Sequence, residues 1–586
     1  MKKVLLIIML ALLTASSAVA QLRGQAPRRE RINRERYERS RYADVADLRL
    51  RAAGTLEEEL GTVMEKQVRL LIIDGQLNNK DLQYIQKLCR RSKVFGADGK
   101  EVDNYIDIDM SRTRINNGGS FFTSTNRDVL SSNMFSSCSH LRSIVLPDRL
   151  RLIDRGAFRN CYDLEDVVLP RGLEAIGDEA FYGCNELINV YLPDGMTSVG
   201  NSAFSGCTRL RNIYIPSSIF RIGDRAFEKT AITDVYLPDR LEYLGAGAFN
   251  GSNLRSLYIP RLTEIGNNDL GKLAYCSEII VDPDNRFYTT EGGALYDRNL
   301  TALLAYPTAL RGALYVPDGV QRIASYACYN CEGLTAVDLP SSVTTIGAYA
   351  FSGCKSLRAI NLPSRCTNFG KAAFHNTPIT SINLPQGTTV IREDLFKDCV
   401  QLTHIDIPES VNTIETDAFH NCRNLQAVVI PDGVITLPKS VFEGCNNLAS
   451  VKFGNGLKEI GEYTFKKCKQ LREVIMPASL RTIGKNAFRD CEIAHLELNE
   501  GLLSIGDNAF SENQLTEFVI PSTVSHIGKK VAEKNKQLGR IVCRGAVPAK
   551  LDKVSNDKIS LVVPADAVNN YKQADNWKKF KNIIGQ

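Results

Sequence analysis

This sequence lacks a long apolar run, a strong charge imbalance and any familiar catalytic motif. The apolar run from Val4 to Leu13 is shorter than the roughly 18 residues that a membrane-spanning helix needs, and no later run reaches that length. The formal net charge of the 586 residues is only +6, which is too small to indicate nucleic acid as a partner. The six histidines lie in no metalloprotease-type frame, and no nucleophile elbow, phosphate loop or dinucleotide-binding fingerprint has the required surroundings. We therefore expect no transmembrane segment, no nucleic-acid partner, no catalytic residues, no metal and no cofactor.

What the sequence does contain is a repeat of 23 residues, occasionally 22, marked by a recurring phenylalanine. One turn reads Leu164-x-x-Val167-x-Leu169-Pro170-x-x-Leu173-x-x-Ile176-Gly177-x-x-Ala180-Phe181-x-x-Cys184-x-x-Leu187. A fixed period in the twenties predicts a repeat solenoid, here of roughly 16–17 turns, in which each turn buries its apolar side against its neighbours. Leu-x-x-Ile-x-Leu-Pro predicts a short parallel strand, Ile-Gly a second extended piece with a tight bend, and Ala-Phe-x-x-Cys a single helical or 3₁₀ turn.

The segments outside the repeat divide the rest of the chain. Lys2 and Lys3, the apolar run and the small residues up to Ala20 predict a signal peptide over 1–20, cleaved after Ala20, and a product that is secreted or held at the cell surface or in the periplasm. Residues 21–45 are arginine-rich and read as a solvated basic linker, or as a segment attached to an anionic envelope. Residues 46–128, in which Leu56–Gln67 and Leu82–Cys89 are predicted to be helices, are expected to form an N-terminal cap, 129–541 the solenoid and 542–586 a C-terminal cap.

One irregular stretch, residues 262–324, interrupts the solenoid. It contains an Asp-rich run that starts at Asp282, a Gly292-Gly293 pair and a hairpin through Leu303 to Pro307. An Asp-rich run beside glycines can form a calcium loop, but the carboxylate that closes a twelve-residue frame is missing here. We therefore expect a turn-rich structural insertion.

Eleven of the sixteen cysteines occupy one repeat position, three residues after the phenylalanine. Shorter turns mostly carry another small polar residue there, such as Thr230, Thr377 or Asn513. Disulfide partners would have to disappear in pairs, and equivalent side chains in stacked turns point the same way, which fits disulfide geometry badly. The pattern favours a ladder of small buried thiols that are reduced in the native protein.

The outward strand positions vary, and one column of them carries tyrosines. The residue before the final Leu-Pro or Ile-Pro of each strand points away from the core by strand alternation. Tyrosine at consecutive turns suits recognition, because it offers a rigid face and a hydroxyl group; it also suits strands, so stacked tyrosines can simply stabilise the ladder. A second column, from Asp338 through Asn361 and Asn383 to Asp406, could face a basic partner or only solvent. The candidate ligand-binding residues are Tyr191, Tyr214, Tyr236, Tyr258 and Tyr315, with Asn189, Asn212 and Asp234 beside them.

The repeat resembles that of the BspA-like leucine-rich repeat family over roughly residues 130–541, and the Asp282 stretch and the closing Tyr571, Ala574, Trp577 and Phe580 are similar to features of that family. The resemblance implies a bacterial surface or secreted protein that acts as a non-catalytic binding or adhesion module, with a protein ligand from host matrix or another cell surface. Two alternatives stay open: a glycan-binding protein that accompanies polysaccharide use, and a passive structural component of the envelope. The shared motif lies in the core and so transfers no ligand and no catalytic residue.

Overall fold

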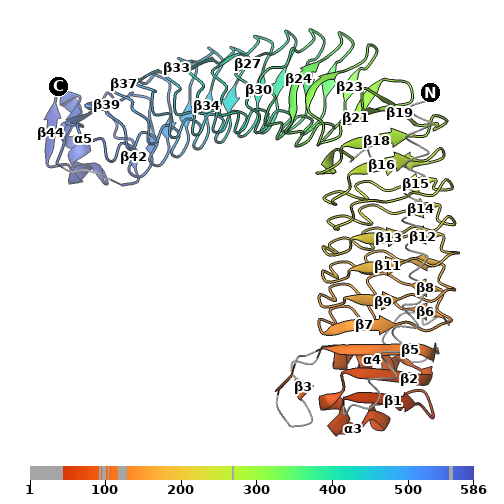
Figure 1. Ribbon diagram of the computed structural model, residues 1–586. Helices are drawn as coiled ribbons and strands as arrows, with labels where there is room; N and C mark the ends of the chain where they lie inside the picture. Colours follow the sequence, from red (N-terminus) through yellow and green to blue (C-terminus); the bar gives the residue numbers. More distant parts are fainter. Residues whose placement is uncertain are drawn as a thin grey trace. The chain divides into compact units, whose positions relative to one another are not determined.

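The computed structural model describes residues 44–90, 94–95, 101–102, 105–116, 128–266, 270–553 and 558–586. The proposed signal peptide and residues 21–43 of the basic segment lie outside these ranges. The chain forms two compact units, Met1–Gly293 and Ala294–Gln586, and the boundary between them falls inside the irregular stretch 262–324. Within each unit, consecutive strands follow one another along the chain as stacked turns (Figure 1). No helix among the described residues has both the length and the apolar character needed to cross a membrane.

The predicted strands of the Leu-x-x-Ile-x-Leu-Pro segments form a parallel ladder in each unit. Register pairs equivalent repeat positions, so Asn189 lies opposite Asn212 and Tyr191 opposite Tyr214. The central residue of each strand is mostly buried while its neighbours are more exposed, as alternation requires. In unit 1 the strands after the cap are β7 (Leu141–Val145), β9 (Asp166–Val168), β11 (Asn189–Tyr191), β13 (Asn212–Tyr214), β16 (Ser256–Ile259) and β18 (Glu278–Val281). In unit 2 they are β22 (Gly312–Tyr315), β24 (Leu334–Asp338), β27 (Ser381–Asn383), β29 (His404–Asp406), β31 (Ala427–Val429), β33 (Ser450–Lys452), β35 (Glu473–Ile475), β37 (His495–Glu497), β39 (Glu517–Ile520) and β41 (Arg540–Cys543).

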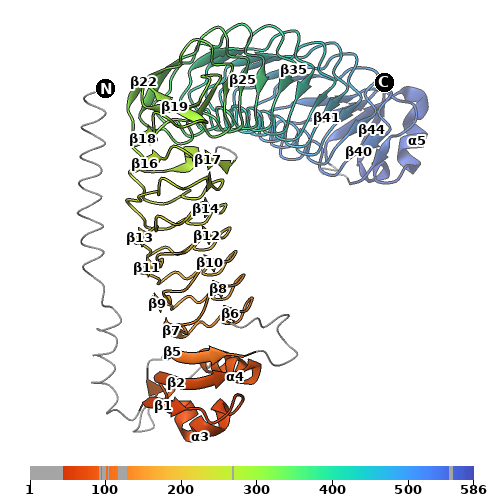
Figure 2. The ribbon, with the colours of Figure 1, turned by 90° about the vertical axis from the view of Figure 1, so that its right-hand side faces the viewer.

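The isoleucine-glycine segments form a second parallel ladder, which Figure 2 shows in unit 1 from β6 to β14. Its strands are two residues long, and the second residue of each, such as Ile176 or Ile222, is buried. In unit 1 they are β6 (Val129–Leu130), β8 (Leu152–Ile153), β10 (Ala175–Ile176), β12 (Ser198–Val199), β14 (Arg221–Ile222), β15 (Tyr243–Leu244) and β17 (Glu264–Ile265). In unit 2 they are β23 (Arg322–Ile323), β25 (Thr345–Ile346), β26 (Asn368–Phe369), β28 (Val390–Ile391), β30 (Thr413–Ile414), β32 (Thr436–Leu437), β34 (Glu459–Ile460), β36 (Thr482–Ile483), β38 (Ser504–Ile505), β40 (His526–Ile527) and β42 (Lys550–Leu551).

The glycine of the isoleucine-glycine segment does not form the tight bend that the sequence predicts. Gly200, Gly223 and Gly245 lack the positive φ that would mark a left-handed turn. A Cβ on Gly223 would lie 2.5 Å from the Asn201 nitrogen and 2.6 Å from the Gly200 carbonyl carbon, both in the backbone of the preceding turn. At Gly200, Gly223 and Gly245, glycine therefore permits the close approach between the backbones of successive turns.

The third side of each turn consists of two tight turns around the phenylalanine. The sequence predicts a single helical or 3₁₀ turn here, and the structure is closer to the 3₁₀ form. The Cys184 amide donates to the Phe181 carbonyl at 3.2 Å, which is a 3₁₀-type bond. A helix cannot continue, because Glu179 (φ 56°) and Gly183 (φ 73°), two residues before and after the ring, are left-handed. The Phe181 amide then donates to the Ala203 carbonyl of the next turn at 2.7 Å, so this side also forms a ladder.

The core is a column of stacked phenylalanine rings beside a column of thiols. Phe181 is fully buried and its ring centroid lies 5.0 Å from that of Phe158 and 5.1 Å from that of Phe204. Most thiols in the second column donate to a backbone carbonyl of the preceding turn. Cys161, Cys184, Cys207, Cys422, Cys445, Cys468 and Cys491 bond the phenylalanine carbonyl 26 residues before them at 3.0 to 3.4 Å.

Threonine and asparagine at the cysteine position also donate to a phenylalanine carbonyl, which the repeat pattern alone did not indicate. The Thr377 hydroxyl donates to the Phe374 carbonyl at 2.7 Å. The Asn513 side chain donates to the carbonyls of both Phe488 and Phe510, at 2.9 and 3.0 Å. The position therefore selects a small side chain with a hydrogen-bond donor, rather than a sulfur atom in particular.

We expect the thiols of the folded protein to react very slowly with an alkylating reagent. The sixteen cysteines, all within the described residues, are buried and form no disulfide. Burial raises the pKa of Cys399 to about 11 and that of Cys422 well above its usual range, so the reactive thiolate of these two is scarce until the pH exceeds that pKa. Hydrogen bonds with Cys161 and Cys89 lower the pKa of Cys138 to about 5, and this residue is protected by its complete burial. Alkylation of unreduced protein, counted by mass spectrometry before and after denaturation, should label few thiols when folded and most of the eleven ladder thiols when unfolded. Ladder thiols that stay unlabelled after denaturation would indicate disulfides and contradict the prediction.

The N-terminal residues extend the first ladder. β1 (Val45–Arg49) pairs in parallel with β2 (Leu70–Leu77). In the same way β2 pairs with β5 (Ile106–Ile115), and β5 with β7. Two helices, α3 (Leu56–Gln67) and α4 (Asn79–Cys89), lie between the strands in sequence, close to where the sequence predicts them. Asn78 and Asp81 form a capping box that starts α4. A short antiparallel pair, β3 (Val94–Phe95) and β4 (Glu101–Val102), follows.

The C-terminal residues do the same at the other end. β43 (Ser560–Val563) and β44 (Asn582–Gly585) join the ladder in parallel, separated by η3 (Ala565–Ala567), α5 (Val568–Gln573) and η4 (Trp577–Lys579). The Trp577 indole donates to the Ala549 carbonyl at 2.6 Å, and the Tyr571 hydroxyl to the Gly545 carbonyl at 2.8 Å. With these end strands the parallel solenoid has about 22 turns, more than the regular repeat alone suggests.

The irregular stretch uses its polar side chains to shape turns. It contains η2 (Leu270–Lys272), β19 (Tyr288–Glu291) and an antiparallel hairpin of β20 (Ala294–Asp297) and β21 (Ala302–Ala305). Asn285 is buried; it donates to the Pro260 carbonyl at 2.7 Å and accepts from the Tyr288 amide at 2.9 Å. After the hairpin, the Tyr306 amide donates to the Ala327 carbonyl at 2.7 Å, so Tyr306 takes the place of a repeat phenylalanine, which the repeat pattern did not reveal.

Candidate binding surface

The tyrosine column lies on the outer face of the first ladder of unit 1. Tyr191 ends β11, Tyr214 ends β13, and Tyr258 lies in β16, each beside a buried core residue. Tyr236 belongs to the turn between β13 and β16, in which residues 231–238 form no strand. That turn is one residue shorter than the preceding one, since 22 residues separate Phe227 from Phe249 and 23 separate Phe204 from Phe227. The prediction that every one of these tyrosines occupies a strand position is therefore wrong for Tyr236.

The exposure of the tyrosines is less uniform than simple alternation suggests. Tyr236 is 40% exposed, whereas Tyr191, Tyr214 and Tyr258 are half-buried. Tyr315, at the end of β22, is 72% exposed, but it belongs to unit 2. The four tyrosines of unit 1 together form one surface, the tyrosine surface, defined by Tyr191, Tyr214, Tyr236 and Tyr258.

The polar residues predicted beside the tyrosines lie in the neighbouring outward column. Asn212 is exposed and its side chain donates to the Asn189 side chain at 3.4 Å. Asp234 is exposed and accepts from the Thr233 hydroxyl at 2.7 Å. Continuing the column, Ser256 of β16 lies opposite Glu278 of β18. This edge of the tyrosine surface is thus made of short amides at one end and carboxylates at the other.

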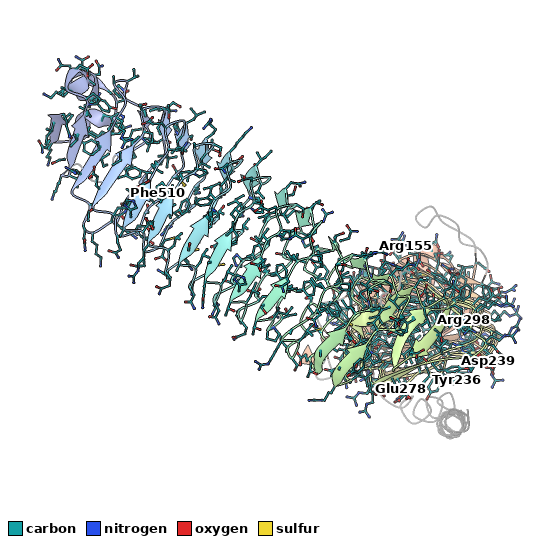
Figure 3. The ribbon with its side chains drawn as sticks, turned by 90° about the horizontal axis from the view of Figure 1, so that it is seen from above. Arg155, Tyr236, Asp239, Glu278, Arg298 and Phe510 are labelled. Atoms are coloured by element: carbon teal, nitrogen blue, oxygen red, sulfur yellow. The ribbon has the colours of Figure 1, made fainter. Side chains whose placement is uncertain are left out.

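Two further carboxylates, which sequence reasoning missed, adjoin the rings. The Tyr258 hydroxyl donates to Asp282 at 2.8 Å, and burial together with this bond raises the Tyr258 pKa well above its usual value. Burial and the Asp239 carboxylate raise the pKa of Tyr236. In the view along unit 1, Tyr236, Asp239 and Glu278 lie on the same side of the unit (Figure 3). The available signal in the sequence was the aspartate that directly follows Pro238.

The other outward column singled out from the sequence lies in unit 2. Asp338, Asn361, Asn383 and Asp406 are all exposed. The His404 side chain lies 3.0 Å from Asp406, so that end of the column already has a partner within the chain. Across the described ranges, no three histidine, cysteine, aspartate or glutamate side chains are placed to hold a metal ion.

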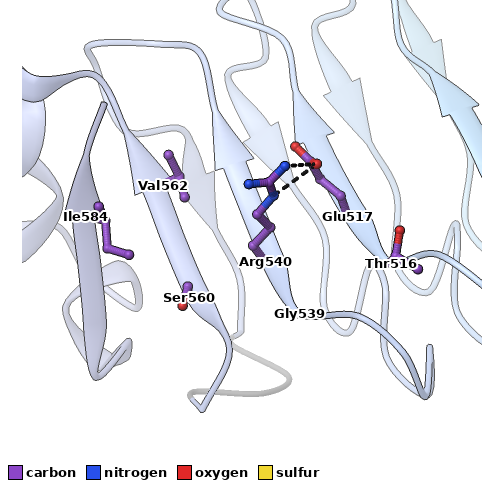
Figure 4. Close-up of a pocket in the computed structure, with 7 residues that line it drawn as sticks. All are labelled: Thr516, Glu517, Gly539, Arg540, Ser560, Val562 and Ile584. Atoms are coloured by element: carbon purple, nitrogen blue, oxygen red, sulfur yellow. Dashed lines mark hydrogen bonds and ion pairs between the residues drawn. The ribbon is translucent and has the colours of Figure 1, made fainter.

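A shallow hollow lies on the outer face of the last strands, β39 to β44 (Figure 4). It exists because Gly539 has no side chain and Ser560 a short one, and Val562 and Ile584 line the apolar part. Arg540 also lines the hollow, and its guanidinium group donates to Glu517 at 2.7 and 3.0 Å. The charges of the hollow therefore neutralise each other, and it offers less for recognition than the tyrosine surface.

Known proteins show what this chain is similar to. It is 24% identical to a leucine-rich repeat protein from Eubacterium ventriosum, over 60% of this chain and 83% of that one, with a TM-score of 0.43. It is 26% identical to a leucine rich cell surface protein from Faecalibacterium prausnitzii, over 66% and 83%, with a TM-score of 0.39. It is 32% identical to a leucine rich repeat protein from T. pallidum, over 32% and 90%, with a TM-score of 0.28. No curated protein matches the chain.

The family of the repeat follows from its own signature. The BspA type leucine rich repeat region matches residues 119–172, 151–279, 321–449 and 436–549, which together make up well over half of the sequence. The matched segments include the turns whose equivalent residues pair in register, whose glycines lie close to the preceding backbone and whose phenylalanine rings stack. The chain belongs to the BspA-type leucine-rich repeat family.

Proposed function

We propose that this protein is an exported, non-catalytic binding module that captures a protein ligand at or outside the cell surface through the tyrosine surface. The observation that carries the proposal is the run of Tyr191, Tyr214, Tyr236 and Tyr258 at equivalent positions of consecutive turns, each beside a short polar or acidic side chain. Export rests on the signal peptide predicted over residues 1–20. Family membership supports a binding role, because in repeat folds function lies in the variable outward positions.

The physical case for this surface is its combination of rigidity and partial exposure. The ladder fixes the backbone, so a tyrosine on it loses little conformational freedom when it binds. The rings present apolar faces, and the neighbouring amides and carboxylates can take part in hydrogen bonds with a partner. Tyrosine is also one of the residues that most often contribute the largest share of binding free energy at interfaces.

The test is a double variant, Tyr214→Ala with Tyr236→Ala, in the chain from Gln21 onward. We expect capture of a protein ligand, identified with a panel of matrix and cell-surface proteins, to weaken by more than about tenfold if the rings behave as interface hot spots. The urea midpoint should change little, since both rings are partly exposed. Affinity is measured by surface plasmon resonance, and unfolding by circular dichroism.

A matched control comes from the same outward column of unit 2. Val429→Ala with Lys452→Ala removes two exposed side chains and should leave capture unchanged. Equal effects of the two double variants, or unfolding of the tyrosine variant, would show that the tyrosines are structural. A glycan array run on the same proteins decides the other candidate: tyrosine-dependent binding to glycans, without a protein ligand, would replace our proposal by a glycan-binding function.

A further inference from the structure

At four tyrosines elsewhere in this protein, a cation from the chain itself lies on the ring and a carboxylate accompanies the pair. The Arg142 guanidinium lies 3.5 Å from the Tyr105 ring centroid and donates to Asp107 at 3.0 Å. Lys466 lies 4.8 Å from the Tyr463 ring and pairs with Glu443 at 2.9 Å. Two further examples are Arg159 with Tyr182 and Glu179, and Arg221 with Tyr243, whose hydroxyl bonds Asp224. In three of these examples the cation on the aromatic face also pairs with a carboxylate, and in the fourth the carboxylate accepts from the tyrosine hydroxyl.

Tyr236 has the ring and the carboxylates of this arrangement but not the cation. Asp234 lies two residues before it and Asp239 three residues after it, and both are exposed. Within the described part of the chain, no arginine or lysine lies over the Tyr236 ring, and neither aspartate forms an ion pair. The same holds for Glu278, which continues the column of Asp234.

Asp239 lies on the same side of unit 1 as Tyr236 (Figure 3), and its charge acts on two rings. Its charge contributes to the raised pKa of Tyr236 and also to that of Tyr258 in the next turn. Tyr258 in turn bonds Asp282. Two adjacent aromatic faces are therefore bordered by carboxylates whose negative charge the described part of the chain does not neutralise with an ion pair.

We propose that the tyrosine surface takes a cationic side chain, arginine in preference to lysine, from its protein ligand, held between the Tyr236 ring and the carboxylates of Asp234 and Asp239. This rests on the proposed function and adds the chemistry of the partner to it. Charge complementarity and the four internal examples favour a basic protein segment as the occupant. Arginine is preferred because its planar guanidinium can stack on a ring while donating to a carboxylate.

The experiment measures binding of three synthetic peptides to the chain from Gln21 onward by fluorescence anisotropy. The first is arginine-rich, the second replaces arginine with lysine, and the third replaces it with citrulline, which keeps the shape without the charge. We expect the arginine peptide to bind tightest and the citrulline peptide at least about tenfold more weakly, since the charge is removed. Asp239→Asn should weaken binding of the arginine peptide about fivefold or more, because the asparagine amide keeps the volume of the carboxylate but lacks its charge.

The control is Asp432→Asn, an exposed aspartate of the other unit that directly follows Pro431, as Asp239 follows Pro238, with Val429 in the place of Tyr236. It should leave arginine-peptide affinity unchanged. The inference is overturned if the citrulline peptide binds as tightly as the arginine peptide, or if Asp239→Asn and Asp432→Asn have the same effect. If a panel protein still depends on Tyr214 and Tyr236 while Asp239→Asn has no effect, the proposed function stands and only the cationic chemistry fails. If no probe depends on the tyrosines, both fail.

Discussion

Replacing Phe181 with alanine is expected to destabilise unit 1 by about 3–5 kcal/mol, the range found when a buried phenylalanine leaves a cavity. Phe181 is fully buried and stacks between Phe158 and Phe204 with interplanar angles of 8° and 2°. The cavity cannot collapse easily, because the hydrogen-bonded ladder on either side fixes the spacing of the turns. Urea unfolding followed by circular dichroism measures the loss.

Phe181→Leu serves as the comparison, since it keeps most of the buried apolar volume. We expect it to cost clearly less than the alanine variant, within about 1–2 kcal/mol. Because a solenoid is held by contacts between neighbouring turns, the alanine variant should also broaden the transition or split it in two. An alanine variant as stable as the leucine variant would show that the phenylalanine column adds little beyond occupying space.

Gly223→Ala is the second substitution expected to have a large effect, although it adds only one methyl group. Its Cβ would lie within 2.7 Å of three atoms of Gly200 and Asn201, two of which are backbone atoms held in the second ladder. Overpacking of this kind costs about 1–3 kcal/mol, and we expect the upper end because a backbone cannot rotate away as a side chain can. Differential scanning calorimetry should show a lower unfolding temperature than for the natural chain.

The matched control is Gly172→Ala in the same unit. A Cβ on Gly172 would meet no atom within 4 Å beyond its chain neighbours, and the residue has no left-handed φ. Alanine there should leave stability unchanged or raise it by about 0.4–1 kcal/mol, because it restricts the unfolded chain. If both substitutions cost the same, close approach of the turns does not explain why glycine recurs in the isoleucine-glycine segments.

The architecture could be predicted from the sequence because identical residues recur at a fixed period. Alternation in Leu164-x-x-Val167-x-Leu169 fixes which side chains face inward, and stacking then sets the register without further information. Helix α3 begins and ends where its pattern predicts, at Leu56 and Gln67. The cysteine position could also be recognised as a buried ladder, since its spacing excludes pairing.

Features that depend on contacts between turns could not be predicted from one turn. The role of Gly223 depends on the distance to Gly200, which no single repeat reveals. Thiol donation to a carbonyl 26 residues earlier depends on the third side being a ladder. Tyr306 was missed because it follows a hairpin strand and because Ala309 stands where the usual turn has its cysteine.

For the candidate surface, the tyrosines could be predicted from the sequence, but the carboxylates that adjoin them could not. The column of tyrosines follows from the period alone, whereas the Tyr258–Asp282 bond joins residues 24 apart across a turn boundary. The proximity of Asp239 to two rings depends on the path of the chain after Pro238. Binding through this surface stays a prediction.

The matching upper and lower faces of the turns have a consequence for how such a chain can change during evolution. Repeat phenylalanine amides bond a carbonyl of the next turn in the same way at places as far apart in the sequence as Phe158 and Phe488. A duplicated or deleted turn therefore meets compatible faces on both sides and shifts no strand out of register. Gene duplication can thus lengthen or shorten the outward tyrosine array by one ring at a time, changing the reach of the surface while the interior keeps its pattern.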